Sequence, residues 1–299
     1  MLLELFAAKP PHVVSLRSVN MVCDLHCHSK ISDGSMGIEE LLTMAKRRGV
    51  AAVSVTDHDA VAGATRACII GKRLGLEVIH GVEMSAYDYE RKRKVHILGY
   101  LCDSPDRLEG MCLRINNSRR AAAKEMVSKV LRYYPIVPET IARHASGSTN
   151  VFKQHIMHAL IEAGYTDSIF GDVFRKLFSS EGGCAYVPVA YPDVREVIDL
   201  IRSAGGLVVL AHPYVYDSID LMHDLDAEGL LDGIEVWHPS NDDERVATLK
   251  DFAQEHSMLM TGGTDFHGMY TGSPRPLGSC GAPENTVQLM KEYKLAHKR

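Results

Sequence analysis

The sequence predicts an α/β protein built on a parallel sheet that is either open or closed into a barrel. From about residue 22 onward, short apolar stretches rich in β-branched residues alternate with segments that repeat apolar residues every three or four positions. The 299 residues are 45% hydrophobic and 24% charged, which is typical of one large or two smaller folded domains. A regular order of strand and helix places successive strands side by side in parallel.

Each predicted element has its own local signal. Apolar, β-branched stretches predict strands at 52–56, 76–82, 95–101, 207–211, 233–236 and 258–261. Amphipathic spacing predicts helices at 38–48, 61–74, 194–204 and 242–255. Gly49, Gly75 and Gly205 stand where three of these helices end, since glycine adopts the left-handed conformation of a helix C-cap at little cost.

The alternation stops between about residues 104 and 185, where the pattern is helical throughout. Helices are predicted at 108–134, 139–145, 151–163 and 172–178. The simplest interpretation is a helical insertion within an α/β domain. We therefore expect an N-terminal extension at 1–20, a domain formed by 21–103 and 186–299, and an inserted helical cap at 104–185.

Composition excludes several classes of protein. The 33 basic and 38 acidic residues give a net charge of −5, so no overall positive field exists to hold a long polyanion. No apolar stretch approaches the roughly 20 residues of a membrane span. The seven cysteines contain no CxxC pair, which argues against a thiolate zinc site and favours a reducing, cytoplasmic compartment. No feature indicates a membrane or an obligate protein partner. The segment RKRK at 91–94 lies between two predicted strands, and we interpret it as a solvated hairpin tip.

Histidine is in surplus, at 15 residues, and the strongest local signal is the segment DLHCHS at 24–29. On a strand, side chains two positions apart face the same way. His26 and His28 would then present two imidazoles to one point, while Leu25 and Cys27 face the packing side. Two converging imidazoles are typical of a metal site.

Carboxylates and imidazoles recur at or near the ends of predicted strands. Ligands of parallel α/β folds gather at the carboxyl ends of the strands, so these side chains are expected to meet there. Imidazole and carboxylate ligands without thiolate suit Mn, Fe or Zn. The segments are TDHD at 56–59, GVEMS at 81–85, VHILG at 95–99, LAHP at 210–213, EVWH at 235–238 and GTDFHG at 263–268.

With these motifs in place, the chain resembles the PHP (polymerase and histidinol phosphatase) superfamily of metal-dependent phosphoesterases, in its stand-alone TrpH/YciV-like branch. The resemblance rests on DLHCHSKISDG at 24–34, TDHD at 56–59, GVEMS at 81–85, HILGY at 96–100, IRSAGGLVVLAHP at 201–213 and GTDFHG at 263–268. It extends over about residues 22–281. It implies a distorted (β/α)7 barrel whose mouth is covered by a helical cap, in agreement with the helical stretch at 104–185.

The resemblance also implies a site for up to three divalent metal ions, Mn, Fe or Zn. Such a cluster would activate a bridging hydroxide as the nucleophile and neutralise phosphate oxygens. Asp57 and Asp59 are candidates to orient the ligands. Carried over position by position, the first metal is assigned to His26, His28, Glu83 and Asp265, the second to Glu83, His96 and His212, and the third to Asp33, His58 and His267.

Substrate contacts are expected from the cap and the barrel mouth, since relatives grip phosphate with cap arginines. Arg119 is favoured for this role, with Arg120 kept as the alternative. At 153–155 this chain departs from the family's pattern, because Lys153 and Gln154 stand where Arg and Pro are common; lysine binds phosphate as a point charge without the planar fork. The remaining candidates are His155 and Arg275 for substrate binding, and Glu83, Asp265 and His238 for catalysis, His238 either to orient the substrate or to donate a proton.

The function expected from the resemblance is hydrolysis of phosphate mono- or diesters of a small metabolite or nucleotide, such as a nucleoside bisphosphate, a cyclic phosphate or the 5′ end of a short RNA. Three alternatives stay open. They are a histidinol-phosphate-type phosphatase, an amidohydrolase-like enzyme that cleaves C–N bonds, and a non-catalytic PHP binding module.

Overall fold

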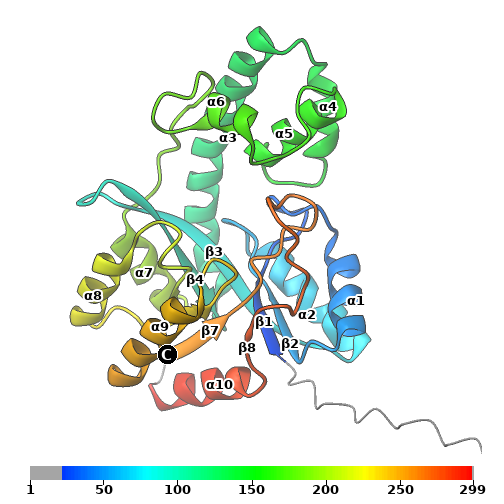
Figure 1. The fold of residues 1–299 in the computed structure, drawn as a ribbon. Coiled ribbons are helices and arrows are strands. Elements are labelled where there is room, and N and C mark those ends of the chain that lie inside the picture. The colour runs from blue at the N-terminus through cyan, green and yellow to red at the C-terminus, as the bar shows by residue number, and fades with distance from the viewer. Residues whose placement is uncertain (1–21, 298–299) are drawn as a thin grey trace, which may run out of the picture.

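A sheet of eight strands, in the order β7-β6-β5-β4-β3-β2-β1-β8, curls into a barrel-like body in the computed structural model, which describes residues 22–297 (Figure 1). The predicted extension at 1–20 lies outside the described residues. The α/β class and the barrel-like arrangement are confirmed. The strands are β1 (Val22–Cys27), β2 (Ala52–Val55), β3 (Glu77–Asp88), β4 (Arg93–Tyr100), β5 (Leu207–Leu210), β6 (Gly233–Trp237), β7 (Leu259–Gly262) and β8 (Ala282–Pro283).

The sheet is mixed, so the prediction of a purely parallel sheet is wrong. β1, β2 and β3 pair in parallel, as do β5, β6 and β7, but β4 is antiparallel to both β3 and β5. The physical reason is the connection between β3 and β4, which contains only residues 89–92. A parallel pair needs a crossover of a dozen or more residues, whereas an antiparallel pair needs only a short turn.

The segment after β7 closes the barrel against β1. Phe266 donates its N–H to the carbonyl of His26, and His28 donates its N–H to the carbonyl of Phe266, at 3.3 and 2.8 Å. Gly263 passes so close to β1 that a Cβ at this position would lie 2.4 Å from the backbone nitrogen of His26. Only glycine permits that approach.

Helices surround this sheet on its outer side (Figure 1). Their apolar faces pack against the strands in three hydrophobic clusters. The predicted helices are found as α1 (Ile38–Arg48), α2 (Ala62–Leu74), α7 (Val194–Ser203) and α9 (Asp243–Glu255), while α8 (Ile219–Ala227) and α10 (Thr286–Ala296) were not predicted. Gly49, Gly75 and Gly205 all have positive φ, between 62° and 72°, as the C-cap argument requires.

The helical stretch between β4 and α7 forms a separate layer above the barrel (Figure 1). Its long helix belongs to both parts: Cys112 and Ile115 pack into the barrel's outer cluster, whereas Met126 and Val130 pack into a cluster of the cap itself. The division at 104 and 185 stays a prediction. No described helix combines the length and apolarity needed to cross a membrane. The elements are η1 (Pro105–Leu108), α3 (Glu109–Tyr133), α4 (Pro138–His144), α5 (Lys153–Glu162) and α6 (Asp172–Phe178).

Candidate metal centre

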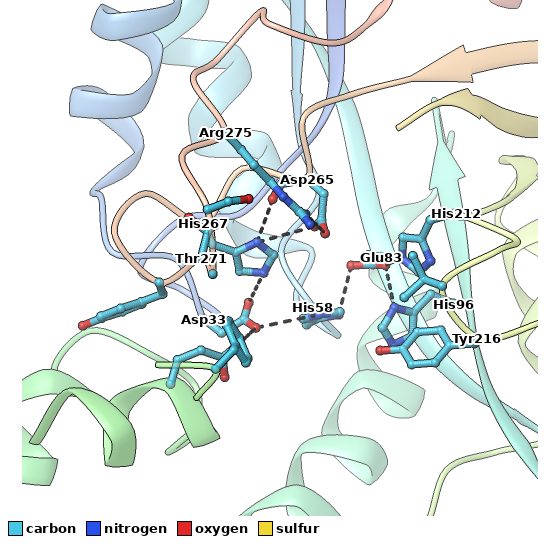
Figure 2. A pocket seen from close by; sticks show the side chains of 16 residues that line it. Asp33, His58, Glu83, His96, His212, Tyr216, Asp265, His267, Thr271 and Arg275 are labelled. Atoms are coloured by element: carbon cyan, nitrogen blue, oxygen red, sulfur yellow. Dashed lines mark hydrogen bonds and ion pairs between the residues drawn. The ribbon is translucent and has the colours of Figure 1, made fainter. Parts of the chain in front are cut away.

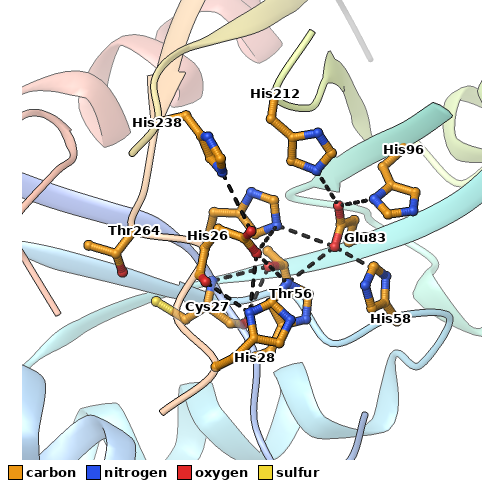
Figure 3. A network of polar contacts seen from close by, with 12 residues as sticks. His26, Cys27, His28, Thr56, His58, Glu83, His96, His212, His238 and Thr264 are labelled. Carbon is orange, nitrogen blue, oxygen red and sulfur yellow. Dashed lines mark hydrogen bonds and ion pairs between the residues drawn. The ribbon is translucent and has the colours of Figure 1, made fainter. Parts of the chain in front are cut away.

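Glu83 lies at the centre of the cluster of predicted ligands (Figure 3). It sits inside β3 rather than at a strand end as predicted, because the β3–β4 hairpin extends the strand beyond the barrel. Five imidazole nitrogens surround its carboxylate. One oxygen faces Nδ1 of His96 at 2.7 Å and Nε2 of His212 at 3.0 Å. The other faces Nδ1 of His58 at 3.1 Å and Nε2 of His28 and His26 at 3.2 and 3.3 Å.

Asp265 completes the first predicted ligand set. Its Oδ1 lies 3.3 Å from Nε2 of His28 and 3.6 Å from Nε2 of His26, the same two nitrogens that face Glu83. The convergence of His26 and His28 on one point is therefore as predicted. Asp265 has φ of 47°, a left-handed conformation that is costly for a residue other than glycine. Asp24 holds the loop in place, because its carboxylate accepts hydrogen bonds from the N–H and Oγ1 of Thr264, at 2.9 and 2.7 Å.

The third predicted ligand set also comes together at the edge of the same cluster. Oδ1 of Asp33 lies 3.2 Å from Nε2 of His267 and 3.6 Å from Nδ1 of His28. Oδ2 of Asp33 lies 4.0 Å from Nε2 of His58. The four residues offer one ligand atom each within 4.8 Å of one another. The structure thus brings together all nine positions to which ligands were assigned.

The cluster has the electrostatic character of a cation site. Six nitrogen and oxygen atoms that face the cluster are buried and make no hydrogen bond of suitable geometry. Buried polar atoms normally have a hydrogen-bond partner. Burial by itself would raise the pKa of Glu83, but the imidazoles of His58 and His96 hold that pKa well below its usual value. Divalent cations would satisfy these atoms, so the donor set fits a metal cluster. The atoms are Nε2 of His26 and His28, Nδ1 of His58 and His96, Oδ1 of Asp33 and Oε2 of Glu83.

A buried carboxylate behind the cluster, Glu235 on β6, was not predicted as a site residue. Its Oε1 lies 2.9 Å from Nδ1 of His26, and its Oε2 accepts a hydrogen bond from the backbone N–H of His212 at 2.8 Å. A hydrogen bond to Nδ1 directs the other ring nitrogen of His26 toward Glu83 and Asp265. An acidic residue within an otherwise apolar buried strand is the sequence signal that could have identified it.

Asp57 and Asp59 support segments next to the cluster. Asp57 accepts hydrogen bonds from the N–H and Oγ of Ser29 at 2.8 and 2.6 Å. Asp59 accepts from the N–H and Oγ of Ser85 at 2.8 and 2.9 Å, and from the guanidinium of Arg119 at 2.6 Å. The same carboxylate therefore fixes both the β3 backbone next to Glu83 and a cap arginine.

A cavity of about 420 Å³ opens onto the cluster (Figure 2). Asp33, Glu83 and Asp265 line it together with the loop at 270–275. A second cavity of about 220 Å³ shares Asp33, His58 and His96 with the first and reaches under the cap, where Arg119 and Lys153 line its wall. Substrate would thus meet acidic and imidazole groups at one end and cations at the other.

The structure separates the two candidate arginines of the cap. The side chain of Arg119 is only 11% exposed and lines the second cavity, with its guanidinium 4.8 Å from the ring centre of Phe152. Arg120 is exposed and donates to Asn117 on its own helix, away from the cluster. Lys153 also lines the second cavity, and burial together with Lys94 and Arg119 lowers its pKa to about 8.

The remaining candidates lie at three different depths. Arg275 lines the first cavity and donates to Oδ2 of Asp265 at 3.2 Å. His238 is buried, with Nε2 at 3.5 Å from that oxygen, and is not among the residues lining the first cavity. His155 is buried too, and its Nδ1 accepts the N–H of Phe152 at the start of α5, while burial lowers its pKa to about 4.

Comparison with known proteins identifies the family to which this chain belongs. The model of the PHP domain matches residues 24–204. A phosphoribosyl 1,2-cyclic phosphate 1,2-diphosphodiesterase of Eggerthella lenta is 38% identical over 256 residues, 85% of this chain and 97% of that protein. A 3′,5′-nucleoside bisphosphate phosphatase of Chromobacterium violaceum is 29% identical over 252 residues, 82% of this chain and 86% of that protein.

A solved structure supports the same assignment. The crystal structure of a protein from Bifidobacterium adolescentis, designated a metal-dependent phosphoesterase, superposes with a TM-score of 0.82. It is 31% identical, and the alignment covers 91% of this chain and 96% of that one. Fold, ligand cluster and sequence therefore agree, and the chain belongs to the PHP domain family.

Proposed function

We propose that this PHP chain is a metal-dependent hydrolase that cleaves a phosphate diester of a small phosphorylated metabolite, with the nine clustered residues holding the metal ions. The observation that carries the proposal is the Glu83 carboxylate, whose two oxygens face five imidazole nitrogens within 3.3 Å. A carboxylate so placed can bridge two cations, which is the arrangement of two-metal phosphoesterases.

Divalent cations bound there would supply Lewis-acid neutralisation of phosphate oxygens and activation of water. The protein's own residues would do the positioning. Glu235 would keep His26 turned toward the cations through its contact with Nδ1. Arg119, held by Asp59 at 2.6 Å, would meet phosphate oxygens at the inner end of the second cavity. Arg275, paired with Asp265, would approach from the loop on the other side.

A cyclic phosphodiester of a sugar phosphate is the substrate class with the strongest support. The Eggerthella lenta relative, whose name specifies such a substrate, aligns with this chain over 97% of its own length. A nucleoside bisphosphate is the second candidate, supported by the Chromobacterium violaceum relative at lower identity. Lys153 in place of the family's common arginine still offers a positive charge to phosphate, but without a bidentate contact.

Turnover by the full-length, metal-loaded protein tests the proposal. Opening of a ribose 1,2-cyclic phosphate to the phosphate monoester, and phosphate release from a nucleoside 3′,5′-bisphosphate, would be measured alongside metal content. We expect Glu83→Gln and His26→Ala to lose metal and at least a hundredfold in kcat/KM, while His223→Ala on the exposed face of α8 behaves as the wild type. Activity retained in both ligand variants would refute the metal-dependent assignment. Hydrolysis of amide substrates instead of phosphate esters would favour the amidohydrolase alternative.

A further inference from the structure

Lys94 is a basic residue of the barrel mouth that the predicted site did not include. It lies on β4 two positions before His96, and in the hairpin it pairs with Tyr87 just as His96 pairs with Ser85. Side chains two apart on a strand share a face, so Lys94 and His96 point into the same mouth. A strand rises about 3.4 Å per residue, so the backbone of Lys94 lies roughly 7 Å farther along β4, away from the metal centre, than that of His96.

The other basic residues of this hairpin are paired with carboxylates or lie at its exposed tip. Arg91 is paired with Asp88 and Asp224, and Arg93 with Asp217. Lys92 at the tip is exposed. The prediction of a solvated tip at 91–94 therefore holds for Lys92 but is wrong for Lys94, because strand alternation turns that one side chain toward the cavities.

Lys153 approaches the same space from the cap. Both lysines line the cavity of about 220 Å³ beside the metal centre and a further cavity of about 560 Å³ that continues outward. The Lys94 ammonium lies 5.4 Å from the ring centre of Tyr191, and that of Lys153 lies 5.2 Å from the ring centre of Tyr186. Within residues 22–297, no carboxylate forms an ion pair with either lysine.

The charge of this region is one-sided. The outer cavity is lined by Lys92, Arg93, Lys94 and Lys153, of which Arg93 is paired with Asp217, and by no Asp or Glu. Tyrosine rings form much of the remaining wall, which leaves the ammonium groups with few polar partners in the protein. Two cations that share a partly buried space without a carboxylate are stabilised when an anion occupies it. The acidic residues of the neighbouring cavity are those of the metal centre itself.

We propose that Lys94 and Lys153 together bind a second phosphoryl group of the substrate, the one that is not hydrolysed. The proposal rests on the proposed function, because it takes the reacting phosphate to lie at the metal centre. Because Lys94 lies farther out on β4 than His96, the second phosphoryl group would lie on the outer side of the reacting one. The substrate class is thereby narrowed to compounds with two phosphoryl groups, and the lysines act in binding and selectivity.

Two nucleotides that differ only in the second phosphoryl group test this inference. Adenosine 3′,5′-bisphosphate and adenosine 3′-monophosphate, both as 3′-phosphonate analogues that resist hydrolysis, would be titrated calorimetrically into the full-length, metal-loaded protein. We expect the bisphosphate to bind at least tenfold more tightly, as one or two charge-assisted contacts imply. Lys94→Met or Lys153→Met is expected to remove most of the difference in affinity between the two nucleotides, whereas Lys94→Arg retains it. Lys124→Met, on the exposed face of α3, is the control and leaves the difference unchanged.

The binding experiment does not depend on catalysis, so its failure is distinguishable from failure of the proposed function. Equal affinity of the parent protein for the two nucleotides overturns the inference even if phosphate esters are hydrolysed. Retention of the full difference in both methionine variants overturns it as well. In the active protein, the ratio of kcat/KM for bisphosphate over monophosphate is expected to fall by about tenfold in Lys94→Met through an increase in KM.

Discussion

Replacement of Lys153 by methionine is predicted to stabilise the folded protein at neutral pH, because this ammonium is charged in an unfavourable place. Burial, with Lys94 and Arg119 nearby, lowers the pKa of Lys153 from 10.5 to about 8. Each pKa unit corresponds to about 1.4 kcal/mol, so charging Lys153 opposes folding by about 3 kcal/mol at most. Loss of favourable contact with the rings of Phe174, Phe178 and Tyr186 offsets about 1 kcal/mol of the gain. We expect a net increase of about 1–2 kcal/mol in the free energy of unfolding.

Urea unfolding of wild type and Lys153→Met at several pH values measures this effect. Below pH 8 the lysine is protonated in both states, and the folded state bears the full penalty. Between pH 8 and 10.5 the unfolded state binds the proton that the folded state has released, so the wild type gains stability relative to the variant and the gap narrows. Lys124→Met, at an exposed position, is the control and is expected to change little. A variant that is less stable than the wild type at pH 7, or a gap that widens with rising pH, would refute the electrostatic reasoning.

Three further predictions concern the metal centre and its surroundings. Prolonged chelation should lower the thermal unfolding midpoint by several degrees, since buried ligand atoms lose their cations, and readdition of Mn²⁺, Fe²⁺ or Zn²⁺ should restore it; an unchanged midpoint would count against a resident cluster. Glu235→Gln should weaken metal affinity by about ten- to a hundredfold, because the carboxylate that orients His26 is lost. Competition with a chelating dye measures this affinity, and an unaltered affinity would show that the contact with Nδ1 of His26 is not needed. Arg119→Ala should raise KM for phosphate esters by about tenfold or more whereas Arg120→Ala leaves it within twofold; similar effects of the two would contradict their placement.

Local patterns in the sequence were enough to place most of the fold. Predicted helices 38–48 and 172–178 match α1 and α6, because an amphipathic stripe or a buried apolar face is a local property of the chain. The helical layer between β4 and α7 was recognised for the same reason. The orientation of β4 was not, since hydrophobic pattern does not tell a parallel strand from an antiparallel one. Helices α8 and α10 were not predicted either, although both pack their apolar residues against the barrel.

The ligand positions could be named from the sequence because its motifs resemble those of the PHP superfamily, and because metal chemistry restricts the residue types that serve as ligands. Which basic side chains line the substrate cavity could not be named from the sequence. Arg119 and Arg120 are adjacent in sequence, yet helix geometry turns one toward Asp59 and the other to solvent. Lys94 looked like part of a basic surface turn until strand register placed it beside His96. The sequence by itself determined the chemistry available to this protein, while only the tertiary structure decided which charged side chains share the cavity, because that depends on register and packing between segments far apart in the chain.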